Sequence, residues 1–240
     1  YNPENKTRAT SIPVAAMIQE RFDITAVPHL TCMNSTRSDL DLTLNVLEYF
    51  GLENVLALRG DGECLPSHEK CFQYASDLVA GIRWRKKELS VGVASYPEGH
   101  PECLDRNGNR DLKGSLHFLK EKVDMGADFS ITQLFLDNDV FLRFLEDARK
   151  VGIEIPIIPG IFPMITTANI KMVKRLTGVK VPSSLESRIL QNEDHPEEIF
   201  WIGVEHAIKQ CKGLMDRVPN IHFYTMDRWR ATDEVIREII

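Results

Sequence analysis

No stretch of this sequence is apolar over the ~18 residues that a membrane-spanning helix needs, and its first residues do not form a signal peptide. The net charge is −6, so the sequence also lacks the basic balance that a general nucleic-acid-binding protein carries. We therefore expect a cytoplasmic protein that binds neither membrane nor nucleic acid.

Cysteine pairs of the spacing used for metals or redox chemistry are lacking too. The five cysteines are scattered, odd in number and contain no C-x-x-C pair, which favours reduced thiols over a disulfide framework. Cys64, His68 and Cys71 could supply three zinc ligands, but no fourth ligand is spaced to close a tetrahedron. The sequence therefore predicts no metal site.

A glycine-rich G-x-G-x-x-G turn, the mark of a doubly wound nucleotide-binding sheet, is also missing. Helical and strand patterns instead alternate from end to end. The six predicted strands span residues 24–30, 54–58, 89–95, 128–135, 155–161 and 220–224. The predicted helices span residues 8–22, 36–50, 71–86, 112–125, 138–151, 166–177, 196–215 and 228–239, with an irregular stretch around Pro182.

This alternation predicts parallel βαβ units. Six strands do not close the usual eight-stranded barrel, and the chain opens in a helical pattern. Two interpretations stay open: an open doubly wound sheet, or a (β/α)8 TIM-type barrel with six of its eight strands in these residues. We favour the barrel, as a single domain over residues 1–240, because the glycine-rich turn is missing.

Polar residues follow most of the predicted strands, and an α/β barrel has its active site at the carboxyl ends of its strands. A single histidine at such an end is more often structural than catalytic, but a whole set of polar ends indicates a ligand site. Planar hydrogen-bonding groups and aromatics with few carboxylates suit a large polar heterocycle better than a divalent metal. The set comprises His29, Thr31, Arg59, Asp61, Tyr96, Pro97, Glu98, Gly99, His100, Gln133, Pro159, Gly160, Tyr224, Thr225 and Arg228.

Longer motifs carry a resemblance to a known family. They are PHLTC (28–32), ALRGD (57–61), YASDLV (74–79), YPEGHPE (96–102), LKEKVDMGAD (119–128), ITQLF (131–135), IPGIFP (158–163) and HFYT (222–225). In this order and spacing, the chain resembles the catalytic domain of methylenetetrahydrofolate reductase, a flavin-dependent eight-stranded α/β barrel. The resemblance implies ping-pong reduction of 5,10-methylenetetrahydrofolate to 5-methyltetrahydrofolate, with FAD as cofactor and NADH or NADPH as hydride donor. We also expect a homo-oligomer.

The resemblance also implies roles for particular residues. Arg59, His100 and Lys122 suit the pyrophosphate and ribose of FAD, and Gly60 would let the backbone approach the flavin. Asp61 falls on the family's active-site aspartate, where its charge would tune the reduced flavin as a hydride donor. The implied FAD-binding positions are His29, Arg59, Gly60, Asp61, Tyr74, Ala75, Tyr96, His100, Pro101, Glu102, Cys103 and Lys122.

The folate-binding positions implied by the resemblance are Asp61, Gln133, Tyr224 and Arg228. Gln133 can both donate to and accept from a pterin edge. Arg228 can pair with the glutamate tail of the folate.

The sequence departs from the family pattern in two places. An ungapped match puts Ser115 where the family has an aspartate that binds the ribose of FAD, and Asp111 is the alternative if the loop 105–110 shifts register. The family's general-acid glutamate and an FAD-contacting threonine, on its first two strands, have no counterpart, and we expect those strands to precede Tyr1. Two other functions therefore stay open: another flavin barrel of the proline-dehydrogenase type, and a non-catalytic barrel that binds folate, flavin or a partner protein.

Overall fold

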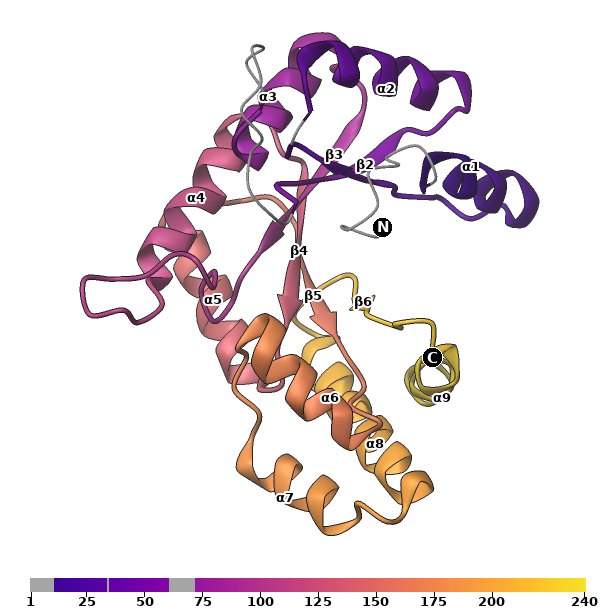
Figure 1. Cartoon of the computed structure of the whole chain (residues 1–240), viewed down its shortest axis with the longest axis vertical. Coiled ribbons are helices and arrows are strands. Elements are labelled where there is room, and N and C mark those ends of the chain that lie inside the picture. The colour runs from indigo at the N-terminus through magenta and orange to yellow at the C-terminus, as the bar shows by residue number, and fades with distance from the viewer. Residues whose placement is uncertain (1–10, 34, 61–71) are drawn as a thin grey trace. The chain divides into compact units, whose positions relative to one another are not determined.

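The computed structural model describes residues 11–33, 35–60 and 72–240, in which helices and strands alternate (Figure 1). The strands are β1 (His29–Thr31), β2 (Asn54–Leu58), β3 (Ser90–Ser95), β4 (Phe129–Leu134), β5 (Ile157–Ile161) and β6 (His222–Phe223). The α-helices are α1 (Ser11–Phe22), α2 (Arg37–Tyr49), α3 (Ala75–Arg85), α4 (Leu112–Asp124), α5 (Asn138–Lys150), α6 (Thr167–Met172), α7 (Ser183–Gln191), α8 (Pro196–Leu214) and α9 (Trp229–Ile239). A π-helix, η1 (Val173–Thr177), directly follows α6. In these described ranges, no helix combines the length and the apolar character needed to cross a membrane.

The six strands belong to one sheet, in which they follow one another in chain order. The pairs β1–β2, β2–β3 and β5–β6 run parallel. A doubly wound sheet reverses its strand order at a switch point, whereas the strands of an α/β barrel are neighbours in chain order. The predicted α/β fold class and its six strands are therefore confirmed, and the strand order fits the barrel rather than the doubly wound sheet.

The chain divides into two compact units. Unit 1 comprises residues 1–94 and 117–130, and unit 2 comprises residues 95–116 and 131–240. Each unit has buried hydrophobic residues of its own. The prediction of a single domain over residues 1–240 stays a prediction.

In unit 1, the central strands β2 and β3 are buried on both faces, which explains why their sequences are nearly continuous apolar runs. Val55, Ala57, Val91 and Val93 have no exposed surface. The register aligns Val55 with Val91 and Ala57 with Val93. Burial of these small apolar side chains from neighbouring strands makes the sheet the centre of this unit.

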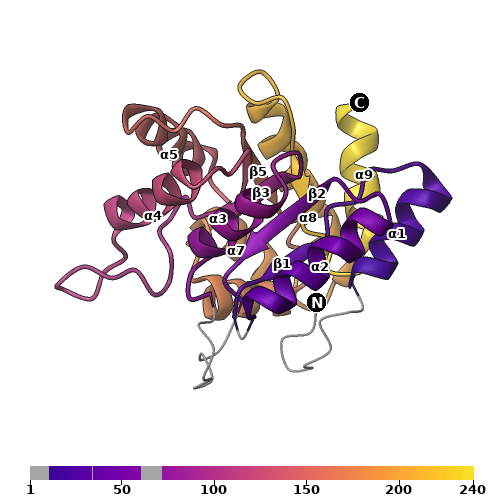
Figure 2. The same cartoon turned by 90° about the horizontal axis from the view of Figure 1, so that it is seen from above.

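Helix α2 forms because its ends and its apolar face are both specified locally. Thr36 and Asp39 make a capping box, in which the Asp39 N–H donates to Thr36 Oγ1 at 3.1 Å and the Thr36 N–H donates to the Asp39 carboxylate at 2.9 Å. Leu40, Leu44 and Leu47 recur at helical spacing and are buried. Helices α2 and α3 lie side by side, as seen from above in Figure 2.

Unit 2 packs its helices over the ends of β4 and β5. Gly203 of α8 is essential to this packing, because a Cβ at this position would lie 2.3 Å from the Met164 carbonyl oxygen. The core cluster comprises Leu134, Leu136, Phe162, Met164, Ile170, Val173, Val179, Val181, Leu185, Ile189, Ile199 and Ile202.

Three elements differ from the sequence-based expectations. The first strand is limited to residues 29–31, because Pro28 lacks the N–H that would extend the ladder and offers only its carbonyl, which accepts from the Leu56 N–H at 2.9 Å. The stretch expected to be irregular around Pro182 contains α7, since a proline is tolerated at a helix start. The helix expected over 166–177 is divided into α6 and η1.

The close approach at Gly203 predicts a large difference between two glycines of α8. We expect Gly203→Ala to lower the free energy of unfolding by ~1–3 kcal/mol, because the added methyl meets backbone that cannot rotate away. The matched control is Gly213→Ala, whose methyl would meet the end of the Asn138 side chain, which can rotate away at the cost of its hydrogen bond to the Gln210 carbonyl. The higher helix propensity of alanine offsets part of this cost, so we expect a loss of at most ~1 kcal/mol. Urea unfolding of the two variants tests this, and equal losses would contradict the packing described.

Candidate functional site

In unit 1, Arg59 and Gly60 follow β2, beside the end of β1. The Met33 N–H donates to the Arg59 carbonyl at 2.9 Å, so the pairing of the two chains continues beyond the strands. Gly60 has a φ of 87°, and a Cβ there would lie 3.2 Å from the Cβ of Thr31. This position therefore favours glycine, because any side chain would need a left-handed backbone and would crowd Thr31 and Met33.

His29 and the start of α3 hold the other FAD-binding positions predicted in this part of unit 1. His29 begins β1, whereas the sequence indicated the carboxyl end of a strand, and it lines a small cavity of about 50 Å³. Tyr74 is exposed and its N–H donates to the Asp77 carboxylate at 3.0 Å, directly before Ala75. Asp61, together with Cys64, His68 and Cys71 of the zinc alternative, lies outside the described residues.

Lys122 of α4 carries a cation in a poorly solvated position of unit 1. Its ammonium donates to the carbonyl oxygen of Ala94 in β3. Although the residue as a whole is half-buried, desolvation of the ammonium lowers the pKa of Lys122 to about 8. A desolvated cation that faces a neutral carbonyl would gain from an anionic ligand, so this residue fits a phosphate group.

In unit 2, the loop that follows β3 forms a compact turn around His100. The Tyr96 and His100 rings meet edge to face with centroids 4.5 Å apart. His100 Nδ1 accepts from the Glu102 N–H at 3.1 Å, and the His100 carbonyl accepts from the Cys103 N–H at 3.0 Å. Pro101 between them is exposed. The loop therefore brings Tyr96, His100, Pro101, Glu102 and Cys103 together, as the prediction of a shared site requires.

Ser115 and Asp111, the two candidates for a ribose contact, both have structural hydrogen bonds. The Ser115 hydroxyl accepts from the His100 N–H at 2.9 Å. The Asp111 carboxylate accepts from the Gly114 N–H at 2.9 Å, at the start of α4. Asp111 is the less buried of the two, so its carboxylate is the more accessible to a further partner.

Arg110 and Glu98 fasten this loop to the segment that follows α6. Arg110 donates to the Gly99 carbonyl at 3.2 Å and to the Thr177 carbonyl at 2.6 Å. The Glu98 carboxylate accepts from the Lys180 N–H at 3.0 Å, and burial nevertheless raises its pKa. The bonds to Thr177 and Lys180 join residues 67 and 82 positions apart in sequence, and no sequence pattern indicates them.

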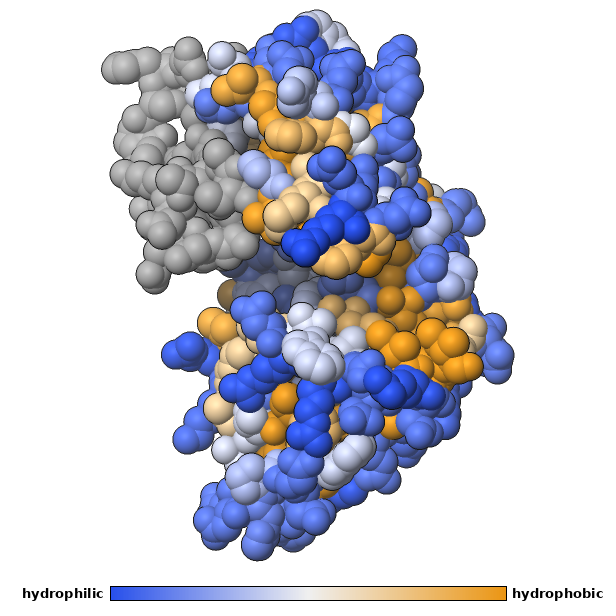
Figure 3. Space-filling view, turned by 90° about the vertical axis from the view of Figure 1, so that its right-hand side faces the viewer, coloured by the Kyte–Doolittle hydropathy of each residue, from blue (hydrophilic) through white to orange (hydrophobic). Residues whose placement is uncertain are grey.

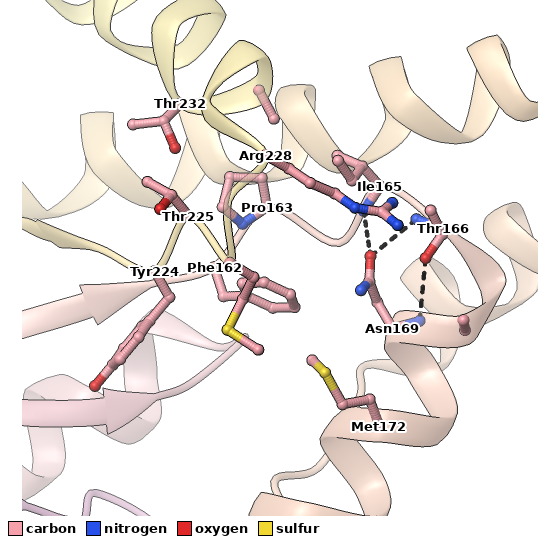
Figure 4. A pocket seen from close by; sticks show the side chains of 13 residues that line it. Phe162, Pro163, Ile165, Thr166, Asn169, Met172, Tyr224, Thr225, Arg228 and Thr232 are labelled. Atoms are coloured by element: carbon pink, nitrogen blue, oxygen red, sulfur yellow. Dashed lines mark hydrogen bonds between the residues drawn. The ribbon is translucent and has the colours of Figure 1, made fainter. Parts of the chain in front are cut away.

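A cavity of about 280 Å³ lies between the segment that follows β5 and the start of α9, all within unit 2 (Figure 4). Tyr224 and Arg228, two of the residues predicted to bind folate, both line it. Figure 4 shows the Arg228 side chain reaching across the cavity toward Ile165 and Thr166. The lining residues are Phe162, Pro163, Ile165, Thr166, Ala168, Asn169, Met172, Tyr224, Thr225, Met226, Arg228, Ala231 and Thr232.

The side chains of Tyr224 and Gln133 both form hydrogen bonds with the backbone of β4. The Tyr224 hydroxyl donates to the Thr132 carbonyl at 2.8 Å, and burial raises the pKa of this phenol, so it stays protonated. The Gln133 side-chain carbonyl accepts from the Leu134 N–H at 2.9 Å. Its amide NH₂ is therefore the group better placed to meet a ligand, which refines the expectation that Gln133 both donates and accepts.

The turn between β6 and α9 is strained. The Arg228 N–H donates to the Thr225 carbonyl at 2.8 Å, and the two residues between them, Met226 and Asp227, have φ angles of 47° and 62°. Two successive non-glycine residues in the left-handed region are uncommon, and such strain concentrates at functional sites. Met226 and Trp229, which lie close to Arg228 in sequence, are exposed. Figure 3 shows one face of the molecule, where hydrophobic residues reach the surface among hydrophilic ones.

Several lining residues were missed by the sequence analysis. Phe162 lies within the IPGIFP motif and could have been found from its place after a strand. Met172, Asn169 and Thr232 come from helices or caps, where nothing in the sequence separates a residue that lines a cavity from one that packs in the core.

The fold and these strand ends define a class: an α/β protein of barrel-type strand order that carries cationic, aromatic and glycine residues where its strands end. The family model for methylenetetrahydrofolate reductase matches residues 1–239. The chain is 36% identical to methylenetetrahydrofolate reductase 2 of Schizosaccharomyces pombe, over 99% of this chain and 39% of that protein. It is 35% identical to the 5,10-methylenetetrahydrofolate reductase of Salmonella typhimurium, over 95% of this chain and 74% of that protein. The chain belongs to the methylenetetrahydrofolate reductase family, and it spans about two-fifths of the length of the eukaryotic relatives it matches.

A solved structure supports the fold. An uncharacterized protein from Clostridium thermocellum, described as binding two copies of 5-methyl-5,6,7,8-tetrahydrofolic acid, superposes with a TM-score of 0.61 over 92% of this chain and 76% of its own. At 14% identity, this likeness concerns the fold alone.

The desolvated ammonium of Lys122 predicts that this residue destabilises the ligand-free protein. A lysine titrates near ~10.4 in an unfolded chain, whereas Lys122 titrates at about 8 in the folded one. Between these values the unfolded state holds more protons, so this lysine makes the free energy of unfolding rise with pH. We expect Lys122→Met to be more stable than the parent at pH 7. We also expect its free energy of unfolding to rise less steeply with pH than that of the parent.

The matched control is Lys120→Met on the same helix, since Lys120 pairs with Asp124 at the surface and exposed pairs contribute only ~0–1 kcal/mol. Chemical unfolding at several pH values between 7 and 10.5 provides the measurement. If the parent and Lys122→Met keep a constant difference in stability over this range, the ammonium is not desolvated.

Proposed function

We propose that the protein containing this chain reduces 5,10-methylenetetrahydrofolate to 5-methyltetrahydrofolate, with FAD as cofactor and NADH or NADPH as hydride donor. The observation that carries the proposal is the family match, which extends along residues 1–239 without a break. The related proteins of Schizosaccharomyces pombe, Arabidopsis thaliana and Salmonella typhimurium are all named as reductases of methylenetetrahydrofolate.

The residues proposed to hold FAD suit its parts. Gly60 would let the backbone approach the flavin ring, because glycine has no side chain to stand between them. The desolvated ammonium of Lys122 donates to a neutral carbonyl, that of Ala94. We propose that the pyrophosphate of FAD provides this ammonium with an anionic partner. We propose a role in FAD binding for the remaining positions as well: His29, Arg59, Tyr74, Ala75, Tyr96, His100, Pro101, Glu102 and Cys103.

When bound, FAD would accept hydride from NADH or NADPH and pass it to the folate in a second half-reaction, the ping-pong order of the proposal. The chain's own residues bind and orient the reactants. Asp61, outside the described residues, is proposed to set the charge beside the flavin.

The residues proposed for the folate are Asp61, Gln133, Tyr224 and Arg228. The amide NH₂ of Gln133 would donate to an acceptor on the pterin edge, since its carbonyl already accepts from Leu134. Tyr224 would form part of the cavity wall, with its hydroxyl committed to Thr132. Phe162, Met172 and Met226 offer apolar contacts for an aromatic ring, and Arg228 offers its cation for the glutamate tail.

The cofactor assignment is tested on the purified full protein. We expect a yellow preparation that releases free FAD on acid precipitation, because the proposed contacts are all noncovalent. NADH or NADPH should bleach the flavin without oxygen, and methylenetetrahydrofolate should then restore its colour. A colourless protein that binds folate would favour the non-catalytic barrel, and a flavin restored by proline-type substrates but not by folate would favour the other flavin barrel.

Two arginines at the start of α9 provide a matched test of the folate site. Arg228 lines the cavity, whereas Arg230 pairs with Glu197 at 2.7 Å and lies over the Phe200 ring. A hydrogen bond to a charged group contributes ~1.5–3 kcal/mol, so we expect Arg228→Gln to weaken folate binding ~10–100-fold. Arg230→Gln should change it less than ~2-fold, since an exposed ion pair contributes little. Calorimetric titration of both variants with 5-methyltetrahydrofolate decides, and equal effects would remove Arg228 from the site.

A further inference from the structure

The cavity of unit 2 contains one polar group that the fold leaves unsatisfied. Thr232, in the first turns of α9, is only 9% exposed and lines the cavity. Its hydroxyl is buried and has no hydrogen-bond partner within the described part of the chain. Buried polar groups of this kind are rare in folded proteins, so each one calls for an explanation.

Other threonines of this chain show the usual way to satisfy such a hydroxyl. In helices, a threonine hydroxyl commonly donates to the carbonyl one turn earlier. Thr43 does so toward Asp39 in α2 at 2.7 Å, and Thr177 does so toward Val173 in η1 at 2.8 Å. The Thr232 hydroxyl does not bond to a carbonyl of α9 in this way; Figure 4 shows it turned to the side of Thr225, another lining residue.

The start of α9 adds further donors at the same place. Arg228, the residue before the first turn, makes no capping hydrogen bond with its side chain among the described residues. The first N–H groups of a helix have no partner within the helix, and they carry its positive end. Arg228 also adds its guanidinium to the cavity. The cavity therefore has a buried hydroxyl at the start of α9 and a guanidinium that reaches across it toward Ile165 and Thr166, and both donors suit an anionic group such as a carboxylate.

Three other polar side chains around the cavity, those of Asn169, Thr166 and Tyr224, already make hydrogen bonds within the fold. Asn169 accepts from the N–H groups of Ile165 and Thr166, both at 3.0 Å, and the Thr166 hydroxyl accepts from the Asn169 N–H at 3.3 Å. The Tyr224 hydroxyl donates to Thr132. These side chains cap α6 or fasten β4, so the unsatisfied hydroxyl is on the α9 side of the cavity.

We infer that the Thr232 hydroxyl donates a hydrogen bond to a carboxylate oxygen of the glutamyl tail of the folate, at the start of α9, and so sets the preference of the site for glutamylated ligands. The inference rests on the proposed function, which supplies a ligand with such a tail. It explains why a threonine is buried at this position without a partner: the partner arrives with the ligand.

The test compares Thr232→Val, which keeps the shape and removes the hydroxyl, with Thr232→Ser, which keeps the hydroxyl. Each is made in the full protein and titrated calorimetrically with 5-methyltetrahydrofolate and with 5-methyltetrahydropteroate, which lacks the glutamyl group. We expect Thr232→Val to bind the glutamylated ligand about 10-fold more weakly and the pteroate within about 2-fold of the parent. Thr232→Ser should retain most of the parent's affinity for both.

A second readout separates a ligand contact from a structural role. Removing a hydroxyl that has no partner should leave the melting temperature of the ligand-free protein unchanged or raise it. A clear fall for Thr232→Val would mean that the hydroxyl is satisfied within the fold, and would overturn the inference. Equal affinity of the parent and Thr232→Val for the glutamylated ligand would overturn it as well.

The outcomes for the parent protein distinguish this inference from the proposed function. A parent that binds both ligands equally would leave the proposed function standing and overturn the role of Thr232. A parent that binds neither ligand would overturn both.

Discussion

The close approach of β4 and β5 at Gly160 is the constraint on which the cavity of unit 2 depends. The Gly160 N–H donates to the Thr132 hydroxyl at 2.9 Å, and the Thr132 carbonyl accepts from the Tyr224 hydroxyl at 2.8 Å. A Cβ on Gly160 would lie 2.5 Å from both the Thr132 carbonyl oxygen and the Tyr224 ring. Because Tyr224 directly precedes the turn that carries Arg228, any residue larger than glycine here would displace the aromatic wall and the cation together.

Both units hold polar groups in positions that are unfavourable without a ligand. Lys122 has a desolvated ammonium that faces a neutral carbonyl, and Thr232 has a buried hydroxyl without a partner among the described residues. Met226 and Asp227 add left-handed backbone beside the same cavity as Thr232. Groups held in this way lower the stability of the free protein, and they need little rearrangement when a ligand binds.

Local patterns were sufficient to predict most elements of the fold. Helix α2 has both its capping box and its apolar spacing within fifteen residues of sequence, and β2 and β3 are continuous apolar runs because both of their faces are buried. The predicted bounds of β1 were wrong, and α7 lies in the stretch that was expected to be irregular. In both cases a proline lies at the boundary, and its effect depends on whether the neighbouring N–H groups have a partner, which is a property of the packed chain.

The sequence by itself determined the order of helices and strands, the polar residues at the strand ends, and the family, because these depend on residue types at short spacing or in a fixed order. Only the tertiary structure decided which polar groups are satisfied. The Arg110 side chain donates to the Thr177 carbonyl and the Tyr224 hydroxyl to the Thr132 carbonyl, whereas the Thr232 hydroxyl forms no hydrogen bond with the described residues. Hydrogen bonding and desolvation depend on neighbours tens of residues away along the chain, and only folding brings those neighbours into contact.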